Sequence, residues 1–115
     1  MVKIINIVKV KGGTTHSLFL DNDGNLYGCG ENGYGQLSHK KKELLTQKLV
    51  ATNVLDFATD GLITFVVKKD GVYSCGTNYY GESGHKENGE YVCFLNKINF
   101  NIGEMVRIVF FVKLI

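Results

Sequence analysis

The 115-residue sequence has no proline, no tryptophan, few cysteines and little net charge. Thirteen basic residues against eleven acidic ones give a formal charge of +2. So small a surplus argues against a dedicated binder of phosphate backbones, and hence against a nucleic-acid partner. Three cysteines are an odd number, which favours reduced thiols in an intracellular compartment over a disulfide framework. The lack of proline and tryptophan indicates no function by itself.

Hydrophobic runs long enough for targeting or membrane insertion are also lacking. Residues 1–9 interrupt their apolar side chains with Lys and Asn and contain no small-residue cleavage site, so we expect no signal peptide. The apolar segment 105–115 is too short to span a bilayer, because a membrane-crossing helix needs about twenty residues. We therefore expect a cytoplasmic or nuclear protein with no membrane partner.

A pattern of turn, strand and glycine-rich loop occurs twice in the chain. Its first copy reads DGNLYGCGENGYGQL at residues 23–37, and its second reads DGVYSCGTNYYGES at residues 70–83. The offset is 47 residues between the turn glycines Gly24 and Gly71 but 46 between Cys29 and Cys75, so the second copy has lost one residue in between. A recurrence at nearly fixed spacing is typical of a repeat array.

Short runs of β-branched and apolar residues predict a series of strands, with hairpin turns at the two Asp-Gly pairs. The expected strands cover residues 4–10, 16–20, 26–30, 54–58, 62–68, 72–76 and 91–95. Residues 40–50 fit this series least, because Leu44, Leu45 and Leu49 permit a helical turn, and we treat the segment as a linker with an optional helix. In the strand 26–30, Gly28 and Gly30 share one face, where we expect another group to approach the backbone closely.

The expected fold is therefore all-β, with antiparallel sheets arranged as two successive units. We assign residues 1–52 to a first repeat with its linker and residues 53–104 to a second repeat. Residues 105–115 would supply a partial strand of a third unit, since 105–108 resemble an opening strand. The expected third unit is incomplete, which favours a fragment or degenerate copy of a longer repeat protein.

The motif Gly13-x-x-His16-Ser17 and the pattern of residues 23–37 resemble the repeat of the regulator of chromosome condensation family. In that family each repeat of about fifty residues forms one four-stranded blade of a β-propeller, usually of about seven blades. The second copy departs from the pattern, because Asp60 and Ile63 stand at the positions of Gly13 and His16. Ser38 also stands where the family usually has another glycine.

The resemblance implies structural roles for a set of repeat positions. Tyr27 and Cys29 would pack between blades, Asn32 would satisfy loop backbone groups with its side-chain amide, and Gly35 would complete a bend. We expect His16 to bond the loop backbone rather than to take part in catalysis. The implied positions are Gly13, His16, Gly24, Tyr27, Cys29, Gly30, Asn32 and Gly35 in the first repeat and Gly71, Tyr73, Cys75, Gly76, Asn78 and Gly81 in the second.

The family includes exchange factors for a small nuclear GTPase, chromatin-associated proteins, scaffolds of ubiquitin ligases and a light sensor built on tryptophans. The absence of tryptophan excludes the light sensor. We predict a non-catalytic protein-interaction module or a fragment of one, and the alternative is a guanine-nucleotide exchange regulator of a small GTPase within a complete propeller. Tyr34, Tyr79 and Tyr80 are the candidate partner contacts, unless they pack against a neighbouring blade.

Two blades cannot close a ring, so strand edges and blade faces would be left open. Three arrangements remain open at this point. The chain is part of a longer propeller protein, it associates with other copies or with another repeat protein, or it folds alone as a small sandwich.

Three specific binding or catalytic motifs are suggested by the same residues, but none of them fits in full. We therefore expect no cofactor, metal or catalytic site. The string Gly28-x-Gly30-x-x-Gly33 lacks the following helix that a dinucleotide-binding loop needs. The turn at residues 21–25 has its glycine at the wrong position for a calcium loop. The spacing of the cysteines and histidines does not fit a zinc site, and these residues are Cys29, Cys75, Cys93, His16, His39 and His85. None of the cysteines has a neighbour in sequence that would activate its thiol as a nucleophile.

Overall fold

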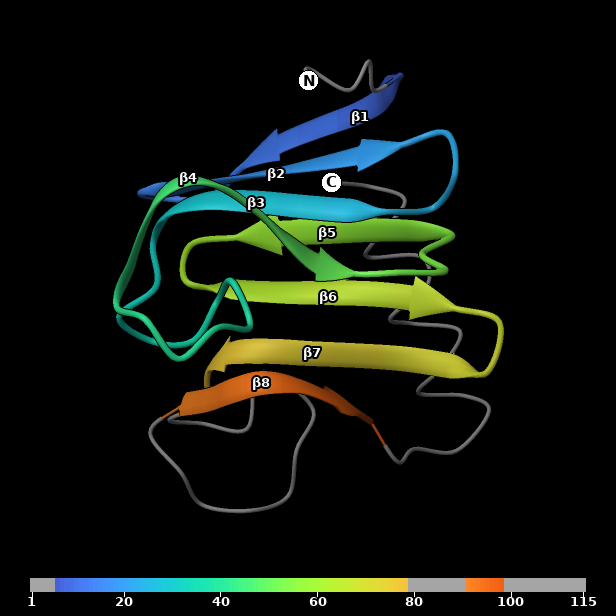
Figure 1. Ribbon diagram of the computed structural model, residues 1–115. Helices are drawn as coiled ribbons and strands as arrows, with labels where there is room; N and C mark the ends of the chain where they lie inside the picture. The colour runs from blue at the N-terminus through green and yellow to red at the C-terminus, as the bar shows by residue number, and fades with distance from the viewer. Residues whose placement is uncertain (1–5, 79–90, 99–115) are drawn as a thin grey trace.

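The computed structural model describes residues 6–78 and 91–98, which form two antiparallel four-stranded sheets (Figure 1). The first sheet contains, in spatial order, β1 (Ile7–Gly12), β2 (His16–Asp21), β3 (Leu26–Glu31) and β4 (Glu43–Ala51). The second sheet contains β5 (Asp56–Asp60), β6 (Ile63–Lys68), β7 (Gly71–Thr77) and β8 (Tyr91–Lys97). The prediction of an all-β fold with two antiparallel units is confirmed.

The Asp-Gly pairs form the hairpin turns that the sequence predicts. In the first turn the Asp21 carboxylate accepts hydrogen bonds from the backbone N–H groups of Asp23 at 3.0 Å and Asn25 at 2.8 Å. This side-chain bonding closes the turn and sets the register in which Leu20 pairs with Leu26. The second turn joins β6 to β7, and Lys68 pairs with Gly71 across it.

The expectation of a linker with an optional helix at residues 40–50 is wrong, because Glu43–Ala51 is the strand β4. Leu44 is buried in the core, whereas Leu45 and Leu49 are exposed. The spacing of the leucines at 44, 45 and 49 permits a helix when the segment is considered without its neighbours. In the folded chain the free edge of β3 supplies the hydrogen-bonding partners for an extended strand, and two register shifts accommodate the fit.

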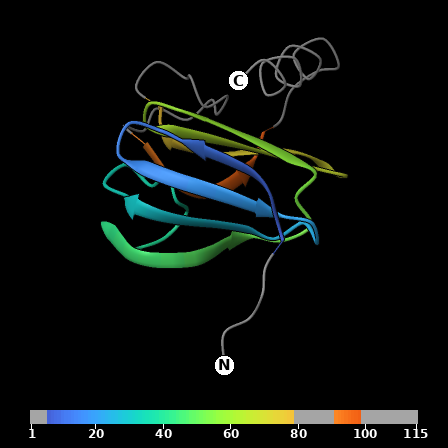
Figure 2. The same ribbon diagram turned by 90° about the horizontal axis from the view of Figure 1, so that it is seen from above.

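The two sheets lie one above the other and bury a shared core between them (Figures 1 and 2). The first sheet contributes leucines from β2, β3 and β4, and the second contributes Phe57 and Val66, both fully buried. The core residues of this junction are Leu18, Leu20, Leu26, Leu37, Leu44, Val54, Phe57 and Val66. A second cluster, Ala58, Ile63, Phe65, Val72 and Ile98, lies on the opposite face of the second sheet.

The ends of the predicted strands agree with those of the observed strands to within three residues. The expected third-unit strand at 105–108 lies outside the described residues, as do Tyr79, Tyr80 and Gly81. Within the described part of the chain, no helix is long and apolar enough to cross a membrane.

Candidate functional site

A buried histidine bridges the two sheets. His16 begins β2, and its Nε2 lies 2.6 Å from the hydroxyl oxygen of Thr59 on β5. That hydroxyl donates its hydrogen to the carbonyl of Ile63 at 2.8 Å, so Nε2 of His16 must be the donor and Thr59 the acceptor. The expectation that His16 bonds loop backbone is wrong, because its partner is a side chain of the neighbouring sheet.

The other ring nitrogen of His16 has no such partner. Its Nδ1 is buried and makes no hydrogen bond within the described residues. Adding a proton there would bury a positive charge without an acceptor, and burial accordingly lowers the pKa of His16 below its ordinary value. The geometry suits a neutral structural histidine that fixes one sheet against the next.

Gly13 makes room for this ring. A Cβ built on Gly13 would overlap the His16 imidazole, so the two positions of the motif Gly13-x-x-His16 depend on each other. The backbone beside Gly13 also joins the sheets, since Thr14 N–H donates to the carbonyl of Gly61 at 3.1 Å. In the second sheet Ile63 occupies the place of His16 and is buried in the second cluster.

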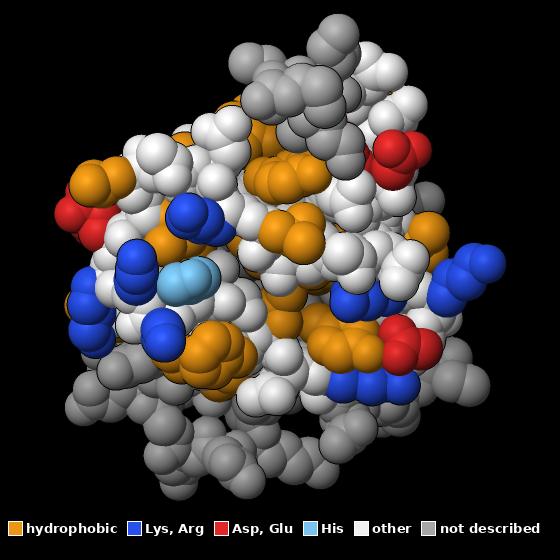
Figure 3. Space-filling model, viewed as in Figure 1, with side chains coloured by type: hydrophobic (Ala, Val, Ile, Leu, Met, Phe, Trp, Pro, Cys, Tyr) orange, Lys and Arg blue, Asp and Glu red, His pale blue; other side chains and the backbone are white. Residues whose placement is uncertain are grey.

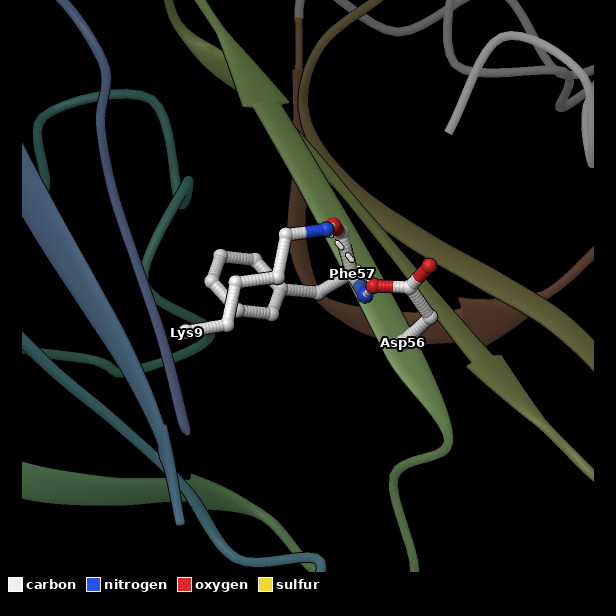
Figure 4. A network of polar contacts seen from close by, with 3 residues as sticks. All are labelled: Lys9, Asp56 and Phe57. Atoms are coloured by element: carbon white, nitrogen blue, oxygen red, sulfur yellow. Dashed lines mark hydrogen bonds and ion pairs between the residues drawn. The ribbon is translucent and has the colours of Figure 1, made fainter. Parts of the chain in front are cut away.

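An ion pair joins the first strands of the two sheets (Figure 4). Lys9 of β1 places its Nζ 2.6 Å from the Asp56 carboxylate and 2.7 Å from the carbonyl of Phe57, both on β5. The same ammonium lies 4.9 Å from the centre of the Phe57 ring. These contacts use the charge of Lys9 to align two strands and leave it unavailable for a ligand.

The loop of residues 32–42 is organised by Asn32. Its side-chain Nδ2 donates to the carbonyls of His39 and, at 2.7 Å, of Lys41, while its Oδ1 accepts from the N–H of Leu37 at 2.8 Å. Gly35 N–H donates to the Asn32 carbonyl at 3.2 Å. Asn32 is 2% exposed, so one amide side chain replaces the strand partners that this stretch of buried backbone lacks.

This loop packs against β7 and β8 of the second sheet. Gly35 has a φ of +78°, and a Cβ there would lie 2.8 Å from the carbonyl oxygen of Val92 on β8. Ser38 Oγ accepts from Leu95 N–H at 2.8 Å, and the Gln36 carbonyl lies 3.5 Å from the Cys75 sulfur. Both a positive φ and close approach by backbone therefore require glycine at position 35.

The glycines that follow the two repeat cysteines share one conformation. Gly30 has a φ of +109° and Gly76 one of +112°. A Cβ on Gly30 would lie 2.6 Å from the carbonyl oxygen of Thr15, and one on Gly76 would meet the carbonyl of Leu62. A close approach was also expected at Gly28, and a Cβ there would lie 2.8 Å from a methyl carbon of Leu37.

The other repeat positions take comparable places in the two sheets. Tyr27 and Tyr73 occupy matching pairing positions and are half-buried, and Asn78 is buried after β7 as Asn32 is after β3. Among the candidate partner contacts, Tyr34 is half-buried within the loop at 32–42, and its N–H donates to the Gln36 side chain at 3.0 Å.

The three cysteines are free thiols. Cys75 is fully buried, and burial raises the pKa of its thiol far above the ordinary range, so it is unreactive. Cys29 and Cys93 are half-buried. No group of three metal-ligating side chains occurs among residues 6–78 and 91–98.

An open groove of about 640 Å³ lies between the two hairpin turns. Figure 3 shows basic and acidic side chains close together at the right, where these turns lie in Figure 1. Tyr73 donates its hydroxyl hydrogen to Asp70 at 2.7 Å, which lowers the pKa of Asp70 and raises that of Tyr73. The ammonium of Lys68 lies 5.0 Å from the Tyr73 ring centre. The groove is lined by Asn22, Asp23, Gly24, Asn53, Val54, Leu55, Lys68, Lys69, Asp70 and Tyr73.

Sequence reasoning missed this groove and the junction partners Lys9, Asp56 and Thr59. A usable signal existed for Lys9 and Asp56, because the offset of 47 residues places them at equivalent positions of the two copies. The groove has no such signal, since its residues come from three segments that only the stacking of the sheets brings together.

Comparison with known proteins connects this geometry to a family. Residues 7–36 match the model of the regulator of chromosome condensation (RCC1) repeat. No curated protein matches the sequence. Among solved structures, human WBSCR16 aligns with a TM-score of 0.76 at 24% identity over 89% of this chain and 28% of its own.

Two structures of the yeast protein align equally well. Yeast RCC1 (Prp20), in a complex with Kap60, has a TM-score of 0.76 and 25% identity over 88% of this chain and 24% of its own. Prp20p from Saccharomyces cerevisiae has the same score and identity over 89% of this chain and 26% of its own. The chain thus spans about a quarter of the length of these proteins. Residues 7–36 therefore match a regulator of chromosome condensation repeat, and the two four-stranded sheets have the fold of blades in the propeller proteins with which the chain aligns.

Proposed function

We propose that the chain is a protein-interaction module made of two propeller blades, and that it works by binding rather than by catalysis. The observation that carries this proposal is how its buried polar groups are used. His16, Asn32 and Thr59 bond backbone or side chains within and between the blades, so they maintain the scaffold.

The groove between the hairpin turns is the surface that we assign to a partner. It combines Lys68, Lys69, Asp23 and Asp70 with the half-buried ring of Tyr73. Mixed charges around an aromatic ring suit a protein loop or peptide, because such groups select a complementary partner by charge while the ring supplies contact area. The loop at residues 32–42 lies at the other end of β3 and is largely used in packing between blades.

Binding measurements with the partners named for the yeast protein test this function. The structures of Prp20 concern Kap60, Gsp1p and histones, which are the probes to use first. We expect at least one probe to bind the natural chain and to bind at least about tenfold more weakly to the double variant Lys68→Glu, Lys69→Glu. Lys48→Glu is the control, because it makes the same Lys-to-Glu change at an exposed position of β4 outside the groove. We expect this variant to bind the probe as tightly as the natural chain does. Equal binding by all three proteins would remove the groove from the proposal.

Nucleotide exchange on a small GTPase is the second candidate, favoured by the resemblance to a family that includes exchange factors and by the likeness to Prp20p. The release of labelled nucleotide from candidate small GTPases separates the two functions. Acceleration at micromolar concentrations of the chain would support exchange activity, whereas binding without acceleration supports an interaction module alone.

A further inference from the structure

Two of the free thiols lie on neighbouring strands of the second sheet. β7 carries Cys75, and β8, the last strand in the order of this sheet, carries Cys93. The two strands pair at Gly76 and Val92. Cys75 precedes the first of these residues and Cys93 follows the second, so both side chains project from the face opposite to that pair. Opposed Cα atoms of antiparallel strands lie about 4.5 to 5.5 Å apart, which is a separation that a disulfide can span.

Both thiols contact the same short loop of the first sheet. The Cys75 sulfur donates to the carbonyl of Gln36 at 3.5 Å. The Cys93 sulfur donates to the carbonyl of His39 at 3.8 Å. These carbonyls are three residues apart in the loop at residues 32–42, which packs on β7 and β8. The loop therefore brings the two sulfur atoms to one place, although the register of β7 and β8 shifts just beyond this point.

The ionisation of Cys75 also depends on Cys93. Burial raises the pKa of the Cys75 thiol, the backbone N–H of Ser38 lowers it, and Cys93 raises it further. One thiol affects the ionisation of another only when the two lie close together. Because S–H groups are weak donors, the contacts with the loop carbonyls do not prevent the sulfur atoms from turning toward each other.

The two thiols differ in what can reach them. Cys93 is half-buried on β8, so a small oxidant in solution reaches its sulfur. Cys75 is fully buried and meets only the groups that already lie beside it. Cys93 is therefore the thiol that reacts first, and Cys75 is the thiol that can then react with it.

The first sheet has only one half of this arrangement. Cys29 occupies in β3 the pairing position that Cys75 has in β7. Leu45 of β4 corresponds to Cys93 of β8, because each follows the residue that pairs with the glycine after the repeat cysteine. The pair of thiols is thus a feature of the second copy rather than of the repeat pattern, and Cys29 is its natural control.

We propose that Cys75 and Cys93 form a modification site, which hydrogen peroxide converts to a disulfide across β7 and β8. The Cys93 sulfur attacks the O–O bond and becomes a sulfenic acid, while the other peroxide oxygen leaves as water. The Cys75 sulfur then attacks the Cys93 sulfur and forms the S–S bond. The hydroxyl that departs from Cys93 takes the Cys75 proton and leaves as a second water. Two electrons pass from the thiols to the peroxide, and no step depends on the proposed function.

Peptide mapping of the full chain after treatment with hydrogen peroxide tests this site. Trypsin without a reducing agent separates the two cysteines into the peptides 70–86 and 87–97, whereas Cys29 falls in the peptide 12–40. We expect monomeric protein to contain the first two peptides linked, at least about tenfold more abundantly than any link to Cys29. Dithiothreitol should restore both free thiols.

Two variants separate the roles of the thiols. Cys29→Ser is the matched control and should form the link to the same extent as the natural chain. Cys75→Ser should stop at the sulfenic acid, which dimedone traps on Cys93. Position 75 is fully buried, so mapping of the natural chain decides the question if this variant does not fold.

Three results would overturn the proposal. Cys93 converted to a sulfinic acid, with Cys75 left as a free thiol, would mean that the two sulfur atoms cannot meet. Links to Cys29 at similar yield would indicate exchange among unfolded chains. A link found only in disulfide-bonded dimers would place the two thiols in different copies. None of these readouts uses the groove, so loss of groove binding and failure of this proposal are told apart.

Discussion

The imidazole of His16 shows how one side chain can fix the order of two blades. It donates a hydrogen bond to Thr59 across the junction, while its second nitrogen stays buried without a partner. A group in this state is stable only when neutral. The junction therefore contains a proton-sensitive point, whatever partner the module binds.

The first prediction concerns pH. Because burial lowers the pKa of folded His16 below its ordinary value of 6.5, the unfolded chain takes up a proton first as the pH falls. The contribution of His16 to stability is fully present above pH 6.5 and decreases below it, with a slope of at most about 1.4 kcal/mol per pH unit. Urea unfolding at several pH values measures this slope.

His16→Gln is the matched variant, because an amide can still donate to Thr59 but does not titrate in this range. We expect the slope to be smaller in this variant by the part that His16 supplies. The same slope in both proteins would contradict the neutral state assigned to His16.

A second prediction concerns Lys9. Lys9→Met keeps an aliphatic chain against Phe57 but removes the ion pair with Asp56 and the bond to the Phe57 carbonyl. The pair is partly exposed to solvent, at 25% and 32% for its two side chains, so the loss should be about 0.5 to 1.5 kcal/mol in the free energy of unfolding. A variant at least as stable as the natural chain would show that the ion pair does not hold the strands together.

At the scale of elements, strands with strong alternation and Asp-Gly turns could be predicted, since both depend on local chemistry. β2, β3, β6 and β7 begin and end within one residue of the expected positions. β4 could not be predicted, because its strand state depends on the free edge of β3 rather than on its own leucines. The repeat pattern predicted that Asn32 bonds the backbone of its loop. The contact of this loop with β8 could not be predicted, because it depends on how the two sheets stack.

The third prediction concerns this loop. Asn32→Ala removes the side-chain hydrogen bonds to the carbonyls of His39 and Lys41 and to the N–H of Leu37. These backbone groups then lose a hydrogen-bonding partner in the folded chain. We expect a loss of about 2 to 4 kcal/mol in the free energy of unfolding, measured with urea. Asn22→Ala, at an exposed position in the first turn, should change it by no more than about 0.5 kcal/mol. Similar small effects of both changes would mean that the loop is not held by Asn32.

At the scale of the molecule, the two blades differ in the burial of equivalent residues. Both have the same strand order, and the pairs β2–β3 and β6–β7 have matching registers, but Cys75 is fully buried whereas the equivalent Cys29 is half-buried. The partial third unit expected from residues 105–115 stays a prediction. The groove lies on the end of the blades where the hairpin turns meet.

The first blade packs on the second by its leucine face, and nuclear Overhauser contacts test this orientation most directly. We predict cross-peaks from the Phe57 ring and the Val66 methyl groups to the methyl groups of Leu18, Leu20 and Leu26. The methyl groups of Val10 and Leu49 should show none to the second blade. Cross-peaks from Phe57 to Val10, Phe19 or Leu49 instead would mean that the first blade packs by its other face, and would contradict the junction described above.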